Sequence, residues 1–315
     1  MSQHDQWDID EDPITLYSLE ELETLPGYKR WDEIDINVDP VVAVCGNYTG
    51  FWAICVMPGQ HRHKTGIIGR TQLGHRVCVG PDCGAHHVPD WENKLSHLRD
   101  RTRMRDYRNT IADAIGRFPE LRTRSQWLWN RPFGGVWLSS NQERMKRMPT
   151  QVRKNLEQRA KFGNVVIHEY EQLSDFEKDE LKAMGTSMAS SSGASTGRAV
   201  EVGRLAGLEI VRRSFKVEMS EVESRMNEIE RRFDARKGNL DYRRWAKWCD
   251  EFERQLEKLD DLLVEGMRFF TRENIALIST HIATAANERM ELARIRFDLY
   301  VRPVGDDASV SAQAA

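Results

Sequence analysis

The chain has 315 residues, of which 30% are charged and 40% are hydrophobic. Its mean hydropathy of −0.62 is typical of a soluble chain that is large enough for two modest domains. No run approaches the ~20 consecutive apolar residues of a membrane span, and the acidic start MSQHDQWDIDEDP is unlike a signal or transit peptide. The chain has five cysteines, an odd number, and no sequence typical of an export signal. We therefore expect reduced thiols and a cytoplasmic protein.

Charge is distributed unevenly although the net charge is only −3. Residues 1–39 carry twelve acidic side chains against two basic ones, whereas residues 94–162 carry seventeen basic against six acidic. A basic region of this size attracts polyanions or the chain's own acidic segment. We therefore predict an acidic N-terminal arm at residues 1–40, with a short helix that the Ser18–Glu21 capping-box pattern begins.

Residues 41–90 have the composition of a small β-rich module. Two β-branched and aromatic runs, PVVAVC (40–45) and FWAICVM (51–57), flank the turn-forming residues GNYTG. This pattern predicts a β-hairpin. Apolar runs interrupted by glycines within residues 65–80 predict one or two further strands.

From Trp91 onward the apolar period becomes helical, and we predict a basic helical domain at residues 91–184. Pro119 is expected to end one helix and to open the next. The uncharged Ser/Gly/Ala tract at residues 185–197 is typical of a flexible linker.

Beyond the linker, apolar residues from Phe215 to Phe233 step by four and three positions, which is typical of a coiled-coil seam. A second amphipathic helix follows. We therefore expect a helical hairpin or coiled coil at residues 198–302, with residues 215–270 mediating self-association or binding a partner protein. Residues 303–315 are predicted to form a disordered tail.

Cysteines and histidines cluster in the β-rich module, since four of the five cysteines and six of the nine histidines fall between residues 45 and 97. In a cytoplasmic protein this clustering indicates zinc, which binds thiolate and imidazole. A small β unit also buries little core, and such units commonly depend on a structural metal. The predicted zinc ligands are Cys45, Cys78, Cys83 and His87. The substitutes are Cys55, His61, His63 and His86, and the alternative is a set of buried free thiols.

The stretch VGPDCG, which follows a KTG turn, resembles the last knuckle of small zinc modules in phage- and plasmid-encoded proteins. The resemblance covers about residues 41–90 and implies a structural zinc. Those modules usually begin with a CxxC pair, whereas this chain has only Cys45 followed by Gly-Asn-Tyr. In addition, His87, Asn93 and His97 follow Cys83 in an order that resembles the HNH nucleases, whose metal-bound finger cuts nucleic acid.

Arginines and tryptophans alternate in the basic region, as they do on surfaces that contact phosphates and stack on unpaired bases. The predicted nucleic-acid contacts are Arg99, Arg101, Arg103, Arg105, Arg108, Arg122, Arg124, Lys146 and Arg147. The alternative is that these cations pair with acidic residues of the chain, and that the tryptophans are core residues.

The predicted fold is mainly α, with a small N-terminal β-rich zinc-stabilised module and a C-terminal helical hairpin or coiled coil. The function that this organisation favours is that of a non-enzymatic, zinc-stabilised nucleic-acid-binding or adaptor protein. One alternative is a protein-only interaction or structural component of phage or mobile-element origin, whose basic region is masked by residues 1–39. A metal-dependent HNH-like nuclease is a further alternative.

Overall fold

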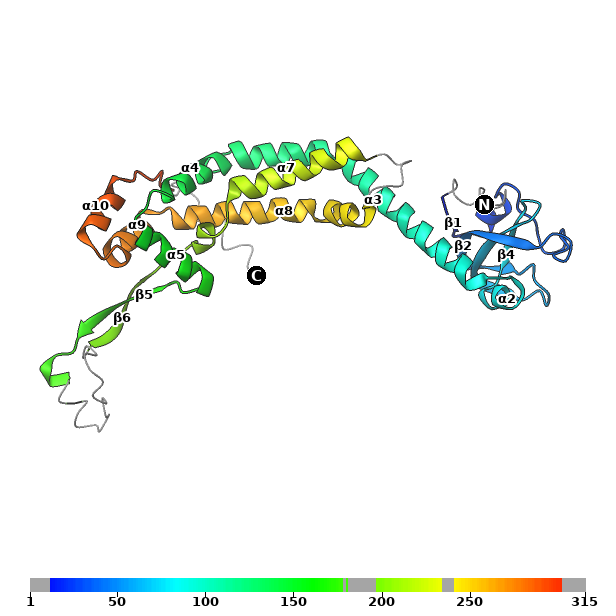
Figure 1. Cartoon of the computed structure of the whole chain (residues 1–315), viewed down its shortest axis with the longest axis horizontal. Helices are drawn as coiled ribbons and strands as arrows, with labels where there is room; N and C mark the ends of the chain where they lie inside the picture. Colours follow the sequence, from blue (N-terminus) through cyan, green and yellow to red (C-terminus); the bar gives the residue numbers. More distant parts are fainter. Residues whose placement is uncertain (1–11, 178–179, 181–196, 234–240, 302–315) are drawn as a thin grey trace. The chain divides into compact units, whose positions relative to one another are not determined.

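The computed structural model describes residues 12–177, 180, 197–233 and 241–301 (Figure 1). This part of the chain is mainly helical and contains a four-stranded sheet and a two-stranded ribbon. It divides into an N-terminal unit, Met1–Ile115 with Phe233–Asp250, and a C-terminal unit, Gly116–Arg232 with Glu251–Ala315. No helix among the described residues is long and apolar enough to cross a membrane.

The sheet of the N-terminal unit has the order β1-β2-β3-β4. Strand β1 (Ile14–Leu16) is parallel to β2 (Val41–Ile54), while β2, β3 (Arg62–Thr71) and β4 (Arg76–Val79) form an antiparallel meander. Beyond the end of β2, the N–H of Val56 donates to the carbonyl of Cys78 at 2.9 Å. The chain that follows β2 therefore reaches β4 as well as β3, and the sheet curls.

The predicted hairpin turn at residues 46–50 is wrong, because β2 passes through this segment as one strand. Instead of forming a turn, these residues shift the register of the pairing with β3. The shifts lie between Val44 and Gly46 and between Thr49 and Ala53. At Gly46 a side chain would collide with the carbonyl of Ile14, so the glycine admits β1 rather than a turn.

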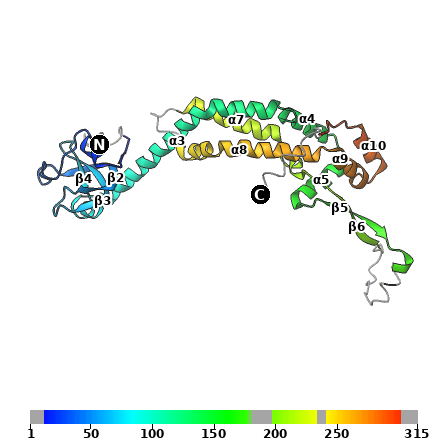
Figure 2. The same ribbon diagram turned by 180° about the vertical axis from the view of Figure 1, so that it is seen from behind.

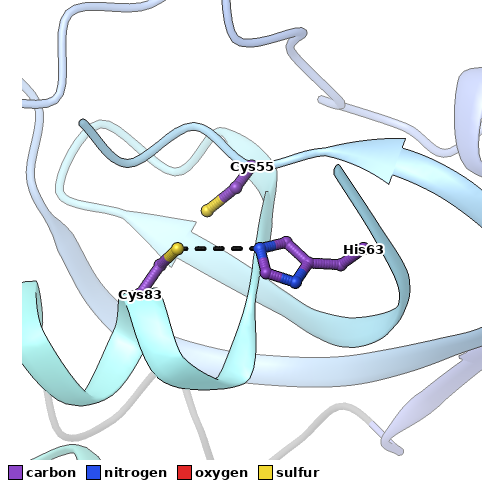
Figure 3. A group of neighbouring side chains, drawn as sticks. All are labelled: Cys55, His63 and Cys83. Carbon is purple, nitrogen blue, oxygen red and sulfur yellow. Dashed lines mark hydrogen bonds between the residues drawn. The ribbon is translucent and has the colours of Figure 1, made fainter. Parts of the chain in front are cut away.

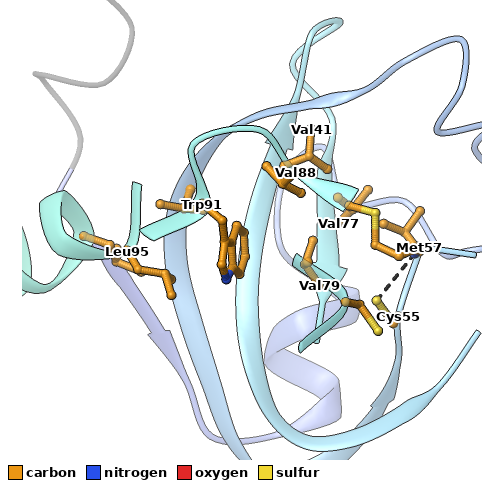
Figure 4. Packing of buried hydrophobic residues seen from close by; sticks show 12 residues of the cluster. Val41, Cys55, Met57, Val77, Val79, Val88, Trp91 and Leu95 are labelled. Carbon is orange, nitrogen blue, oxygen red and sulfur yellow. Dashed lines mark hydrogen bonds between the residues drawn. The ribbon is translucent and has the colours of Figure 1, made fainter. Parts of the chain in front are cut away.

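Each face of the sheet covers its own apolar core, because successive strand residues point to opposite faces. One core contains Leu16, Leu22, Cys45, Tyr48, Ala53, Ile68 and Cys78. The other lies against helix α2 (Pro81–His87) and the start of helix α3 (Trp91–Asn130), with Trp91 and Leu95 packed among valines, Met57 and Cys55 (Figure 4).

The acidic segment contributes to the first of these cores. Ser18 caps helix α1 (Leu19–Glu23) by accepting a hydrogen bond from the N–H of Glu21 at 3.1 Å, which confirms the predicted helix start. The side chain of Leu22 is fully buried. Residues 12–39 are thus part of the compact N-terminal unit as well as a carrier of negative charge.

The prediction that Pro119 separates two helices is wrong, since α3 continues from Trp91 to Asn130 with the proline inside. A proline within a helix forfeits one backbone hydrogen bond. The adjacent Phe118 is fully buried, and its ring packs edge-on against Phe252 at a centroid distance of 5.6 Å. We infer that this packing maintains the helix through the proline.

The remaining elements begin after α3. The helices are α4 (Gly135–Met145), α5 (Thr150–Phe162), α7 (Phe215–Arg232), α8 (Tyr242–Phe269), α9 (Arg272–Leu277) and α10 (Ala286–Arg294), with short turns η1 (Leu208–Val211) and η2 (Ile278–Ile282). Strands β5 (Val166–Gln172) and β6 (Gly197–Arg204) form the antiparallel ribbon, so the region predicted as helical from residue 198 begins with a strand.

In the C-terminal unit, α7 lies beside α3 and α8 in both views (Figures 1 and 2). The seam predicted on α7 is buried from Phe215 to Ile229, and Phe215 packs on Trp129 of α3. A hairpin or coiled coil stays a prediction, because residues 234–240 between α7 and α8 lie outside the described part. The predicted linker, except Gly197, and the predicted tail at residues 303–315 lie outside it too.

Candidate metal centre

Three potential metal ligands meet where two strands and a helix of the N-terminal unit come together (Figure 3). Cys55 follows the last residue of β2, and His63 is the second residue of β3. The antiparallel register pairs His63 with Ala53, which brings the histidine beside the end of β2. Cys83 is the third residue of α2, whose preceding residue, Gly80, follows the end of β4.

The ligand atoms of Cys55, His63 and Cys83 all lie within 4.8 Å of one another. Cys83 Sγ is 3.6 Å from His63 Nε2. A tetrahedral zinc ion with Zn–S of ~2.3 Å and Zn–N of ~2.0–2.1 Å separates its sulfur and nitrogen ligands by about 3.6 Å. The distance also fits a thiol–imidazole hydrogen bond, so metal content distinguishes the two.

The sulfur of Cys55 accepts two backbone hydrogen bonds, from the N–H of Gly80 at 3.2 Å and from that of Met57 at 3.4 Å. At Cys83, burial and the nearby Cys55 sulfur raise the pKa of the thiol to about 11. A bound divalent cation opposes this rise, because coordination requires and stabilises thiolates.

Gly80 allows the three ligand side chains to approach one another because it has no side chain of its own. A Cβ at this position would collide with Nε2 of His63. Gly80 therefore has two roles: its N–H contacts the Cys55 sulfur, and its bare Cα leaves room for the His63 ring.

Of the four ligands predicted from the sequence, only Cys83 belongs to this group. Cys45 and Cys78 are buried in the core on the other face, where the Cys45 thiol donates to the carbonyl of Ile68 at 3.4 Å. His87 is exposed at the end of α2. Two of the substitutes, Cys55 and His63, take their place.

A signal for Cys55 and His63 was present in the sequence. Pro58 and Gly59 stand between the two residues and are strong turn formers. In the structure Gly59 has φ of +91°, within the turn that joins β2 to β3. Placing the hairpin at this turn instead of at residues 46–50 would have brought Cys55 next to His63.

The residues that resemble an HNH motif do not form a metal-binding group. The side chain of Asn93 donates to Asp90 at 2.5 Å, and His87 and His97 are exposed. Among the described residues, the Cys55–His63–Cys83 group is the one set of three or more His, Cys, Asp or Glu side chains close enough to hold an ion.

Several of the predicted nucleic-acid contacts pair with acidic or carbonyl groups of the chain. Arg105 donates to the carbonyl of Pro13, and Arg108 pairs with Asp12. In the C-terminal unit, Arg122 pairs with Glu230 at 2.7 Å. The exposed pairs Arg103–Asp100 and Lys146–Glu143 join residues three apart on one helix or at its end. Arg101 also has a partner, while Arg99 and Arg147 are exposed and Arg124 is half-buried.

The tryptophans of the basic region lie in different environments. Trp129 packs against Phe215, whereas Trp127 is 56% exposed, with the guanidinium of Arg131 4.5 Å from its ring centroid. Trp127 is therefore exposed to solvent, whereas Trp129 is half-buried.

Comparisons with protein-family models, curated proteins and solved structures give no match at any part of the chain.

Proposed function

We propose that this chain is a non-enzymatic nucleic-acid-binding protein whose N-terminal unit is ordered by one zinc ion. The observation that carries the metal part is the convergence of Cys55, His63 and Cys83. Thiolate and imidazole ligands together select zinc over magnesium or calcium, which prefer oxygen. An ion at this point would join the β2–β3 hairpin to α2, and so to the helix that follows it.

A structural role fits this position better than a catalytic one. Cys55 and Cys83 are buried within an apolar core, and the hydrogen bonds to the Cys55 sulfur come from backbone N–H groups rather than from a general base. Structural zinc sites have four protein ligands. For the fourth we propose His61, whose ring centroid lies 6.4 Å from that of His63 on the same hairpin.

Metal analysis of the purified full-length chain tests the zinc proposal. We expect about one zinc per chain, and its loss in Cys83→Ser and His63→Ala. Cys45→Ser is the matched control, because it changes a buried cysteine on the other face of the sheet and should keep the ion. A metal-free wild type, or equal zinc content in Cys83→Ser and Cys45→Ser, would contradict the proposal.

The nucleic-acid part rests on the excess of basic residues between positions 94 and 162. The ion pairs that several of them make do not weigh heavily against it. Exposed pairs such as Arg103–Asp100 and Lys146–Glu143 stabilise the fold little because water screens both charges, so phosphates can replace the carboxylates. Because bound phosphates release counterions, affinity for a DNA duplex should fall steeply between 50 and 200 mM salt. An affinity that is independent of salt would contradict this part.

A second candidate function is a protein-only component whose basic region is masked by its own N-terminal segment. The observation that favours it is the contact of Arg105 with Pro13 and of Arg108 with Asp12. A chain that begins at Ile14 removes both contacts and retains Leu16 and Leu22 in the core. Masking predicts nucleic-acid binding by this shortened chain and none by the full-length chain. Equal binding by both would exclude masking.

A further inference from the structure

Four arginines line one groove of the C-terminal unit, with a volume of ≈ 490 Å³. Arg144 lies in the last turn of α4 and Arg147 just beyond it. Arg294 ends α10, and Arg296 follows two residues later. Glu291 is the acidic residue of the lining, so positive charge is in clear excess.

The groove has two arms, which are the end of α4 and the segment that follows α10. The fully buried side-chain amide of Asn141 holds the two arms together. The side chain of Asn141 donates to the carbonyl of Asp298 at 2.8 Å and accepts from its N–H at 2.9 Å. The indole of Trp137 donates to the same carbonyl at 2.8 Å. Further along, the N–H of Tyr300 donates to the carbonyl of Phe270 at 2.8 Å. The segment after α10 is thus fixed against α4, and the arginines of both arms are positioned before any ligand binds.

The charges of the groove are not neutralised by the described residues. Arg144 donates to the amide oxygen of Asn141 at 3.4 Å, and none of the four arginines forms an ion pair with a described carboxylate. Elsewhere in the same unit arginines do find acids, as Arg117 does with Glu253 and Arg122 with Glu230. Gathering four arginines around a single acidic residue is unfavourable, and an anionic ligand would reduce that cost.

We propose that this groove binds the phosphodiester backbone of a nucleic acid. The proposal rests on the nucleic-acid-binding function and gives it a location. Guanidinium groups bind phosphate oxygens in a bidentate manner, and all the cations of the groove are arginines. Arg144 and Arg147 are spaced by three residues, and Arg294 and Arg296 by two, so each arm presents a repeated charge.

A polymer with one charge per unit fits this arrangement better than the irregular acidic surface of a folded protein. Arg147, Arg294 and Arg296 are exposed, which leaves room for a continuous strand. The groove lining offers no aromatic ring or amide to read a base. Binding here is therefore expected to follow the backbone and not the sequence.

The test measures binding of a fluorescent 20-base-pair DNA duplex to the full-length chain between 50 and 200 mM salt. In Arg294→Ala/Arg296→Ala, we expect the slope of log affinity against log salt to fall by about 2, and the affinity at 50 mM salt to fall roughly tenfold or more. The matched control is Arg232→Ala/Arg268→Ala, which removes the same charge from two exposed arginines that pair with Glu228 and Glu265. The control should retain most of both the affinity and the slope.

A second variant acts in the opposite direction and does not depend on the loss of arginines. Glu291→Gln removes the acid of the groove and should raise affinity a few-fold. If the groove variant binds like the control, or if Glu291→Gln has no effect, the groove is not the site, although the chain still binds nucleic acid. Absence of binding by the wild type would instead overturn the proposed function itself. Competition by polyglutamate at concentrations equal to those of DNA would identify an acidic protein as the ligand and overturn the proposal.

Discussion

Two pairs of buried cysteines lie on opposite faces of the same small sheet, and they differ in what surrounds the sulfur atoms. Cys45 and Cys78 belong to one core, and Cys55 and Cys83 to the other. All four are at most 7% exposed, so burial does not distinguish them. The difference is that the second pair has an imidazole, that of His63, beside it.

The first pair has the properties of neutral thiols. The Cys45 thiol donates to the carbonyl of Ile68. Burial raises the pKa of Cys78 to about 12, more than the hydrogen bond with Tyr28 lowers it. These cysteines behave as small hydrophobic residues. At Cys55, by contrast, backbone N–H groups donate to the sulfur. The comparison teaches that hydrogen-bond direction separates a core cysteine from a candidate ligand where burial does not.

The largest effect that tests this comparison is expected from removal of the metal. A chelator should lower the stability of the wild type, because at free zinc a thousandfold above Kd a ligand of the folded state contributes about 4 kcal/mol. Cys55→Ser should melt at the same temperature with and without the chelator. Cys45→Ser should still respond to it.

Thermal unfolding followed by circular dichroism measures this effect. An equal response of the two serine variants to the chelator would show that the two pairs do not differ. If the chelator does not change the melting temperature of the wild type, the 3.6 Å contact between Cys83 and His63 is a hydrogen bond and not a shared metal site.

A smaller effect is expected from Gly80→Ala, which leaves every ligand in place. The added methyl group would displace the His63 ring, and groups that support metal ligands typically change metal affinity by 10–100-fold. Zinc affinity, measured by competition with a chromophoric chelator, should fall by about this factor. Gly116→Ala in α3 is the control, because a Cβ there meets open space. Equal affinities in the two variants would show that His63 does not bind the ion.

The sequence predicted local features well and distant pairings poorly. The Ser18 cap and the buried seam that begins at Phe215 follow from patterns within a few turns of chain, and both are confirmed. The metal group depends on the turn between β2 and β3. Strands usually have about five or six residues, and β2 has 14. A turn was therefore predicted inside it, which favoured Cys45 over Cys55.

Other features required tertiary packing that no local pattern contains. Pro119 indicated a helix end, but the contact of Phe118 with Phe252 joins residues far apart in the chain. The arginine groove likewise brings Arg144 next to Arg294. The sequence predicted the basic character of the first of these regions and not its juxtaposition with the second.

The smallest effect concerns the pair without the imidazole and depends on pH. Cys78→Ala should retain its zinc and lose about 1–2 kcal/mol of unfolding free energy at pH 7.5, because it empties part of a buried site.

The folded Cys78 has a pKa raised from 9.0 to about 12 by burial, so the unfolded thiol ionises first as pH rises. Between pH 9 and 12 the unfolded state therefore binds fewer protons, and wild-type stability falls. The variant lacks this contribution, so its stability gap to the wild type should narrow, by about 1 kcal/mol at pH 10. Urea unfolding at pH 7.5, 9 and 10 measures the gap. A gap that stays constant would mean that Cys78 is not held as a neutral thiol, which would remove the distinction between the two faces.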